Sequence, residues 1–180
     1  NARLHLTEKN NLQVLNLPID IFFHSLAEDF EDKAIGVILS GTGSDGSKGI
    51  RVIKENGGII IAQDPDSSKF DGMPKSAITT GTVDYILSPQ EIPEKIMSYV
   101  KHPYIIDKDK NIDLAKVPED YLSKIILFIK ETFGLDFTYY KDTTISRRIE
   151  RRLSINQIEN LKDYLDYLYS SQNEQKPLYK

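Results

Sequence analysis

The chain has 180 residues and a formal net charge of −4, from 23 basic and 27 acidic side chains. It contains no cysteine, which excludes disulfides and thiolate metal ligands. The acidic balance argues against a general nucleic-acid-binding protein, and no apolar run is long enough for direct membrane insertion. Without a signal peptide, these features predict a cytoplasmic chain of one or two domains.

The first half of the chain alternates predicted helices and strands. Apolar residues at helical spacing predict a helix near residues 19–30. Its expected buried face comprises Ile19, Phe22, Phe23, Leu26, Ala27 and Phe30. His24 falls outside this face, so we expect it at the surface. Further helices are predicted near residues 47–56, 75–80 and 88–101, and strands near residues 35–39, 59–63 and 83–87.

A glycine-rich turn follows the first predicted strand. The apolar run from Ile35 to Leu39 is typical of a strand that is covered on both faces of a parallel sheet. Glycines recur at positions 41, 43, 46 and 49, where they allow sharp turns and positive φ angles. Asp45 is the one carboxylate in this turn. We expect it at the carboxyl edge of the sheet, where open α/β folds place their chemistry.

Several roles fit this turn when the residues alone are considered. The G-x-G-x-x-G pattern of residues 41–46, with Asp64 after the next strand, matches a dinucleotide-binding loop. Against that role, Asp45 would repel the phosphates. Asp45 or Ser44 would also suit as the N-cap of the next helix, and Asp45 would suit as the carboxylate that orients a histidine in a nucleophilic triad. No metal site is predicted, since the acidic segment after residue 64 lacks the spacing of a calcium loop.

Four segments within residues 1–102 together resemble a known family. They are Ile19–Ala27, Val37–Gly46, Ile59–Asp64 and Gly72–Ile78. Their order and residues strongly resemble the C-terminal half of chemotaxis protein-glutamate methylesterases, the CheB family. The resemblance implies a partial doubly wound parallel sheet and a Ser-His-Asp triad that hydrolyses glutamate methyl esters on chemoreceptors, with glutamine deamidation left open. It makes Asp45 the triad aspartate, and it assigns to active-site loops Gly41, Thr42, Gly43, Gly46 and Met73.

The chain departs from the family pattern in two respects. Thr42 stands where the family usually has methionine, so the packing around the reacting carbonyl is expected to differ. The family's nucleophilic serine and its histidine lie upstream of the matched region, and no comparable serine turn occurs in this sequence. Ser40 is better explained as a strand-end hydroxyl that bonds to backbone. We therefore expect the chain alone to be inactive.

The pattern changes after His102. Alternating charges near residues 107–111 indicate a linker, and the apolar residues beyond it recur at helical spacing. One stripe comprises Leu122, Ile125, Ile126, Ile129 and Phe133, and another comprises Ile158, Leu161, Leu165 and Leu168. A capping box at Ser154 and Gln157 is expected to start the later helix. A small all-α domain is thus predicted.

Four arginines stand out in this helical half. Arg147 and Arg151 are spaced i,i+4 on one predicted helix, as are Arg148 and Arg152. Such a stripe attracts an anionic surface. On composition alone, a solvated helix face is the commonest explanation of such a stripe, and a nucleic-acid contact is a second.

A second resemblance accompanies these arginines. Residues 134–153, together with Tyr164 and Leu165, are similar to the N-terminal helical domain of chemotaxis receptor methyltransferases, the CheR family. The resemblance implies that the four arginines contact the receptor. It also implies S-adenosylmethionine as the methyl donor, bound by a further domain that we expect to be absent from this chain. No cofactor is expected within the chain itself.

Together the two resemblances predict an internal piece of a methylesterase–methyltransferase fusion. The expected parts are a methylesterase segment over residues 1–102, a linker over residues 103–117 and a helical domain over residues 118–180. The expected partners are chemoreceptors, and an incomplete sheet edge is expected to favour self-association. The main alternative is a non-catalytic module that docks on the receptor through the arginine helix. A dinucleotide-binding domain is a further alternative.

Overall fold

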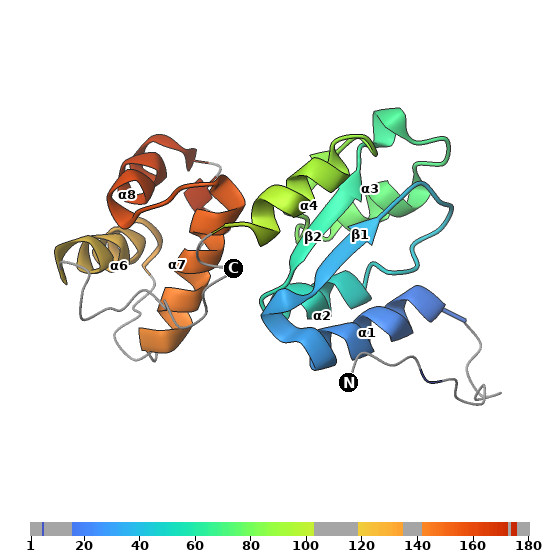
Figure 1. Ribbon diagram of the computed structural model, residues 1–180, viewed down its shortest axis with the longest axis horizontal. Coiled ribbons are helices and arrows are strands. Elements are labelled where there is room, and N and C mark those ends of the chain that lie inside the picture. Colours follow the sequence, from blue (N-terminus) through green and yellow to red (C-terminus); the bar gives the residue numbers. More distant parts are fainter. Residues whose placement is uncertain (1–4, 6–15, 103–118, 135–141, 173, 176–180) are drawn as a thin grey trace. The chain divides into compact units, whose positions relative to one another are not determined.

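The computed structural model describes residues 5, 16–102, 119–134, 142–172, 174 and 175. It divides into two compact units, which we call the α/β unit, residues 1–94, and the helical unit, residues 95–180 (Figure 1). Helix α4, Ile92–Val100, spans the division. The predicted linker over residues 103–117 lies outside the described residues, and the domain limits stay predictions.

The α/β unit contains a parallel three-stranded sheet. Its strands are β1 (Ile35–Ile38), β2 (Ile59–Gln63) and β3 (Tyr85–Leu87), in the order β1-β2-β3. Its helices are α1 (Pro18–Phe30), α2 (Gly49–Glu55) and α3 (Gly72–Thr79), with short 3-10 turns at Glu31–Lys33 and Pro65–Ser67. The register pairs Ile35 with Ile59 and Ile61 with Tyr85. The predicted α/β class is confirmed.

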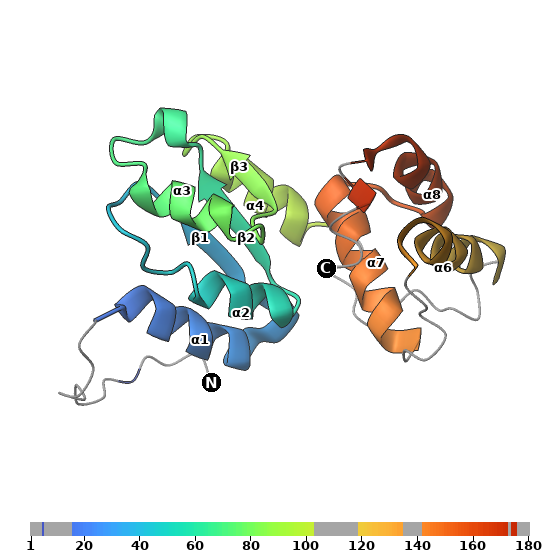
Figure 2. The ribbon, with the colours of Figure 1, turned by 180° about the vertical axis from the view of Figure 1, so that it is seen from behind.

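The core of this unit lies between the sheet and its helices. Residues of α1, β1, α2, β2 and α3 form one apolar cluster, and Figure 2 shows α2 and α3 in front of the strands. All five residues of β2 are buried, as expected of a parallel strand. In β1, by contrast, only Gly36 and Ile38 are fully buried. The prediction that this strand is covered on both faces was therefore too strong.

Helix α1 buries a narrower face than its sequence predicts. Phe23 and Ala27 are buried, whereas Phe22 and Phe30 remain 44% and 39% exposed. The physical reason is that α1 packs chiefly against α2 and not against the sheet, so one narrow stripe suffices to fill the contact. His24 is exposed, as predicted.

A buried carboxylate joins β3 to the rest of the sheet. The Asp84 side chain is only 1% exposed, and its Oδ1 lies 2.5 Å from Lys54 Nζ in α2. Its Oδ2 accepts a hydrogen bond from the Ile60 amide at 2.9 Å, while the Asp84 amide donates to the Ile60 carbonyl at 2.9 Å. The residue before β3 is thus bonded to β2 through both its backbone and its side chain.

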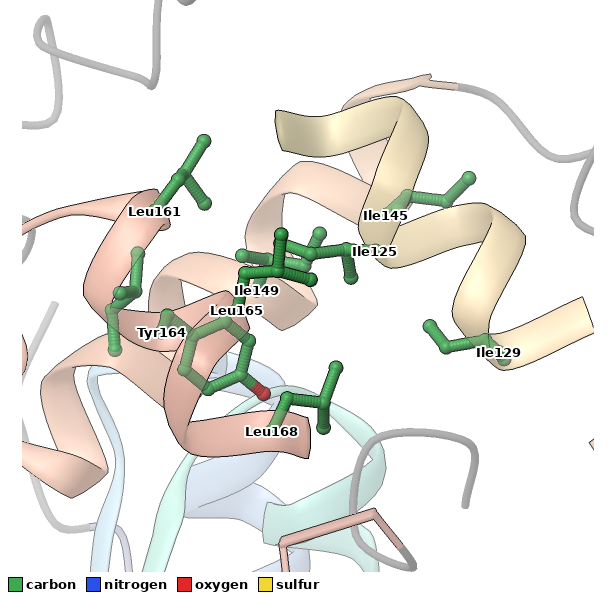
Figure 3. Packing of buried hydrophobic residues seen from close by; sticks show 9 residues of the cluster. Ile125, Ile129, Ile145, Ile149, Leu161, Tyr164, Leu165 and Leu168 are labelled. Carbon is green, nitrogen blue, oxygen red and sulfur yellow. The ribbon is translucent and has the colours of Figure 1, made fainter. Parts of the chain in front are cut away.

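The helical unit contains α6 (Glu119–Phe133), α7 (Asp142–Asn156) and α8 (Leu161–Ser170). Side chains from all three helices lie together in its core (Figure 3). Every residue of the two predicted apolar stripes belongs to this core or packs against it. The predicted all-α character of the second half is confirmed.

The predicted capping box was wrong. Ser154 lies inside α7, and Gln157 takes a positive φ of 56° just after that helix ends. The cap of α8 is Asn160, whose side chain accepts a hydrogen bond from the Asp163 amide at 2.9 Å. Ser154 and Gln157 therefore lie at the end of α7, and Asn160 caps the start of α8.

The sheet has two edge strands. Within the described residues it has three strands, so β1 and β3 are its edges. The predicted self-association through such an edge stays a prediction. None of the helices in the described part of the chain combines the length and apolarity that a membrane span requires.

Candidate functional site

Asp45 lies in the loop between β1 and α2, and its carboxylate binds the start of α1. Oδ2 accepts a hydrogen bond from the Ile19 amide at 3.1 Å, and Oδ1 accepts one from the Asp20 amide at 3.0 Å. Both amides belong to the first turn of α1, where backbone N–H groups have no partner within the helix. The positive end of the α1 dipole adds to this stabilisation of the negative charge.

Asp45 is therefore a cap, but not of the helix that the sequence suggests. The helix that follows it, α2, begins at Gly49 and is bonded by Asp20 instead. Asp20 Oδ1 accepts from the Lys48 amide at 2.9 Å and from the Gly49 amide at 2.8 Å. Asp45, which precedes α2, thus caps α1, and Asp20 of α1 caps α2. Sequence reasoning missed Asp20, although an acidic residue in the first turn of a helix was visible.

The glycines of the loop have steric roles. Gly43 and Gly46 have φ angles of 87° and 90°, a region that other residues rarely adopt. A Cβ atom on Gly46 would lie 2.8 Å from Ile38 Cδ1. These two positions require glycine for the backbone to reverse beneath Asp45.

The loop is bonded to the segment that leads into α3. The Gly41 amide donates to the Phe70 carbonyl at 2.9 Å, and the Met73 amide donates to the Gly41 carbonyl at 2.9 Å. A Cβ atom on Gly41 would overlap Met73 Sδ at 2.4 Å. Among the predicted site residues, the structure therefore brings together Gly41, Gly43 and Met73, with Thr42 exposed between the two glycines.

This geometry argues against the dinucleotide alternative. A pyrophosphate would need the free amides at the start of α2. The amides of Lys48 and Gly49 already bond to Asp20, and the amides at the start of α1 bond to Asp45. Two carboxylates occupy the places where phosphate groups would bind.

The Asp45 carboxylate keeps acceptor capacity for a further donor. An ionised carboxylate has about four lone-pair positions, and the two amides use two of them. Asp45 is also half-buried and not enclosed. None of the three histidines in the described residues bonds to it. His5 and His24 are exposed, and His102 bonds to Ser154 in the helical unit.

The contact between His102 and Ser154 is structural. His102 Nδ1 lies 3.2 Å from Ser154 Oγ, and that hydroxyl donates to the Glu150 carbonyl at 2.9 Å. Burial lowers the pKa of His102, which favours the neutral ring. Ser154 is completely buried, so no substrate reaches this serine.

The four arginines of α7 do not share one environment. Arg147 and Arg148 are exposed, Arg151 is half-buried, and Arg152 is buried. Arg152 Nε donates to Glu174 Oε1 at 2.8 Å, and its Nη2 forms an ion pair with Glu174 Oε2. The interpretation of Arg152 as a surface contact is therefore corrected, because its charge is used inside the helical unit.

Tyr164 completes this buried cluster. Its hydroxyl donates to Glu174 Oε1 at 2.8 Å. Burial, and next the negative charge of Glu174, raise the pKa of Tyr164. We refer to Arg152, Tyr164 and Glu174 as the buried ionic cluster.

Comparison with known proteins decides the family. The family profile described as CheB methylesterase matches residues 2–96, more than half of the chain. The chain belongs to the CheB methylesterase family. A second profile, described as the all-alpha domain of CheR methyltransferase, matches residues 120–180. Both resemblances noted in the sequence are thereby confirmed.

Several curated relatives share parts of this CheB-family chain. A putative protein-glutamate methylesterase/protein-glutamine glutaminase of Leptospira interrogans is 50% identical over 76 residues, covering 42% of the chain and 39% of the relative. The corresponding Pyrococcus horikoshii protein is 40% identical over 96 residues, covering 53% and 26%. An uncharacterised 104.1 kDa protein of Rhodobacter capsulatus is 36% identical over 192 residues, covering 95% and 20%. The chain spans about two fifths or less of each of these relatives.

A solved structure is also similar. The catalytic domain of the Thermotoga maritima CheB methylesterase is 44% identical, with a TM-score of 0.43, over 43% of the chain and 41% of that domain.

Proposed function

We propose that the α/β unit contributes to a protein-glutamate methylesterase in which Asp45 orients the catalytic histidine. One observation carries the proposal: a carboxylate in the loop after β1 is fixed by two backbone amides and still keeps acceptor capacity. In Ser-His-Asp hydrolases, such a carboxylate fixes the imidazole tautomer and stabilises the imidazolium that forms. Membership of the CheB methylesterase family supports this assignment.

The serine nucleophile and the histidine would come from residues outside those described. The histidine would take the serine proton as the hydroxyl attacks the ester carbonyl, and Asp45 would stabilise the resulting cation. The histidine would return that proton to the leaving methoxide, so that methanol departs in the first step. Water would then hydrolyse the acyl-enzyme and free the glutamate side chain of the receptor. The same acyl chemistry would deamidate glutamine, with ammonia as the leaving group.

We further propose that the helical unit binds an acidic surface of a chemoreceptor. Arg147 and Arg148 are exposed on α7, with Arg151 half-buried beside them. The match to the CheR all-alpha domain supports this role. S-adenosylmethionine would be the methyl donor in such a reaction.

The test of the esterase proposal is methanol release from methyl-esterified receptor by the full-length natural protein. Asp45→Asn separates the two roles better than Asp45→Ala does, because the oxygen of the asparagine side chain can still accept a hydrogen bond from one α1 amide. If Asp45 belongs to a triad, turnover falls by about 10⁴-fold. If Asp45 is only a helix cap, the rate stays close to that of the unmodified protein.

Asp64→Asn is the matched control. Asp64 is a carboxylate in the neighbouring loop, and its Oδ1 accepts a hydrogen bond from the local Asp66 amide at 3.0 Å. We expect its turnover to be unchanged. An equal loss in both variants would mean that general disturbance of the loops, and not the triad, explains the result.

The second candidate function is a non-catalytic receptor-binding module. It is favoured by the finding that helix capping alone accounts for both oxygens of Asp45. Charge reversal at Arg147 and Arg148 should then abolish receptor binding, while Asp45→Asn leaves binding unchanged and no methanol is released by any form.

A further inference from the structure

Asp20 is bonded to the Asp45 loop at two points. Its backbone amide donates to Asp45 Oδ1 at 3.0 Å. Its own Oδ1 accepts from the amides of Lys48 and Gly49 at 2.9 and 2.8 Å. Only two residues, Gly46 and Ser47, separate Asp45 from Lys48. One residue of α1 therefore holds both ends of the segment that carries the candidate triad carboxylate.

The packing around Asp20 leaves little freedom for movement. The residue is only 7% exposed. A Cβ atom on Gly49 would lie 2.5 Å from Phe23 Cβ and 3.1 Å from the Asp20 carbonyl, so α1 and α2 approach closely at this point. A shift of the Asp20 side chain would consequently move the start of α2 and, with it, the loop. A buried carboxylate is costly unless it is hydrogen-bonded, and here the two loop amides supply those bonds.

We propose that Asp20 is a positioning residue that fixes the Asp45 carboxylate in the orientation needed for histidine. The proposal rests on the esterase function proposed above. Asp20 touches neither the substrate nor the reacting atoms; it acts through the loop amides and through the Asp45 carboxylate. Misplacement of a catalytic group by about 1 Å costs roughly 10²-fold in rate, so removal of the two side-chain bonds should be visible in turnover.

The experiment is a double-mutant cycle on methanol release by the full-length natural protein. Asp20→Ala should lower kcat by about 10- to 100-fold with little change in KM. Asp20→Asn should restore most of the rate, because one oxygen makes both loop bonds in the native protein. In an Asp45→Ala background, Asp20→Ala should cause no further loss of kcat, since the group that it positions is gone.

Asp20→Glu provides a second variant if the alanine form does not fold. It keeps the charge but moves the acceptor oxygen by one methylene, and it should also lower kcat. Amide hydrogen exchange on the chain itself gives a readout without activity. In Asp20→Ala, the amides of Ile19 and Asp20 should lose protection together with those of Lys48 and Gly49, because Asp45 moves as well.

The outcomes separate the two proposals. If Asp45→Ala leaves methanol release intact, the esterase proposal fails. If Asp45→Ala abolishes turnover but folded Asp20→Ala and Asp20→Glu are as active as the native protein, the positioning role is wrong and the esterase proposal stands. The positioning role is also overturned if Asn does not restore the rate, or if Asp20→Ala lowers kcat equally with and without Asp45.

Discussion

Removing Glu174 should destabilise the helical unit strongly. The side chains of Arg152 and Glu174 are 9% and 2% exposed, and Glu174 accepts bonds from Arg152 and from the Tyr164 hydroxyl. Glu174→Ala would leave the arginine charge buried without this partner. Breaking a buried ion pair on one side costs about 3–5 kcal/mol. For a domain of this size, such a loss lowers the melting temperature by about 10 °C or more.

The assay is amide hydrogen exchange measured for individual peptides by mass spectrometry, together with thermal unfolding monitored by circular dichroism. Amides of α7 and α8 should lose protection in Glu174→Ala, while those of α2 in the α/β unit serve as an internal reference. Joint replacement of Arg152 by Met and Glu174 by Leu should recover much of the loss, because apolar residues of similar volume often replace a buried pair without penalty.

Asp71→Ala is the matched control for this experiment. It breaks the ion pair between Asp71 and Lys75, whose oxygen and nitrogen lie 2.6 Å apart on the surface. Exposed pairs contribute little, so no measurable change is expected. A Glu174→Ala protein as stable as this control, with unchanged exchange in α7, would refute the reasoning that the buried ionic cluster holds the unit together.

Two further predictions concern the loop and the pH dependence. In urea unfolding, Gly46→Ala should destabilise the α/β unit more than Gly43→Ala. Both glycines have a positive φ, but only at Gly46 would the new methyl group lie 2.8 Å from Ile38 Cδ1. Equal losses in the free energy of unfolding would mean that backbone strain alone explains the effect. The pKa of Tyr164 is raised above its ordinary value of 10.0, so above pH 10 the folded state keeps a proton that the unfolded state loses. The contribution of Tyr164 to the free energy of unfolding should therefore be fully present below pH 10 and decrease as the pH rises further. The slope should disappear in Tyr164→Phe, and a slope that persists there would assign the effect to other groups.

Local periodicity was sufficient to predict most of the fold. The apolar stripes of α6 and α8 are all part of the helical core, because i, i+3 and i+4 spacing leaves little choice of which face is buried. Boundaries were less certain. Helix α3 begins at Gly72, three residues before the predicted start, since a proline at position 74 is compatible with the first turn of a helix.

Contacts between distant residues could not be predicted in this way. Asp45 was visible as a carboxylate suited to capping, but its partners Ile19 and Asp20 lie 26 and 25 residues earlier. Likewise, the i,i+4 spacing placed Arg152 on the same stripe as Arg148. Only the position of Glu174, 22 residues later, shows that one of these two charges is buried. The spacing of residues predicts which side chains share one face of a helix. It does not predict which residues of other segments pack against that face.

The hydrogen bonds and the ion pair of Asp84 help to determine the register of β3 against β2. A three-residue strand offers few ladder bonds, and a slip by one residue would exchange the half-buried Tyr85 and Leu87 with the exposed Ile86. Asp84 adds a backbone bond and a side-chain bond to Ile60, and it is also anchored to Lys54 on α2. A slipped strand would leave this carboxylate buried away from both partners. Its main effect is thus to make wrong pairings unfavourable, so that the shortest strand of the sheet has one alignment.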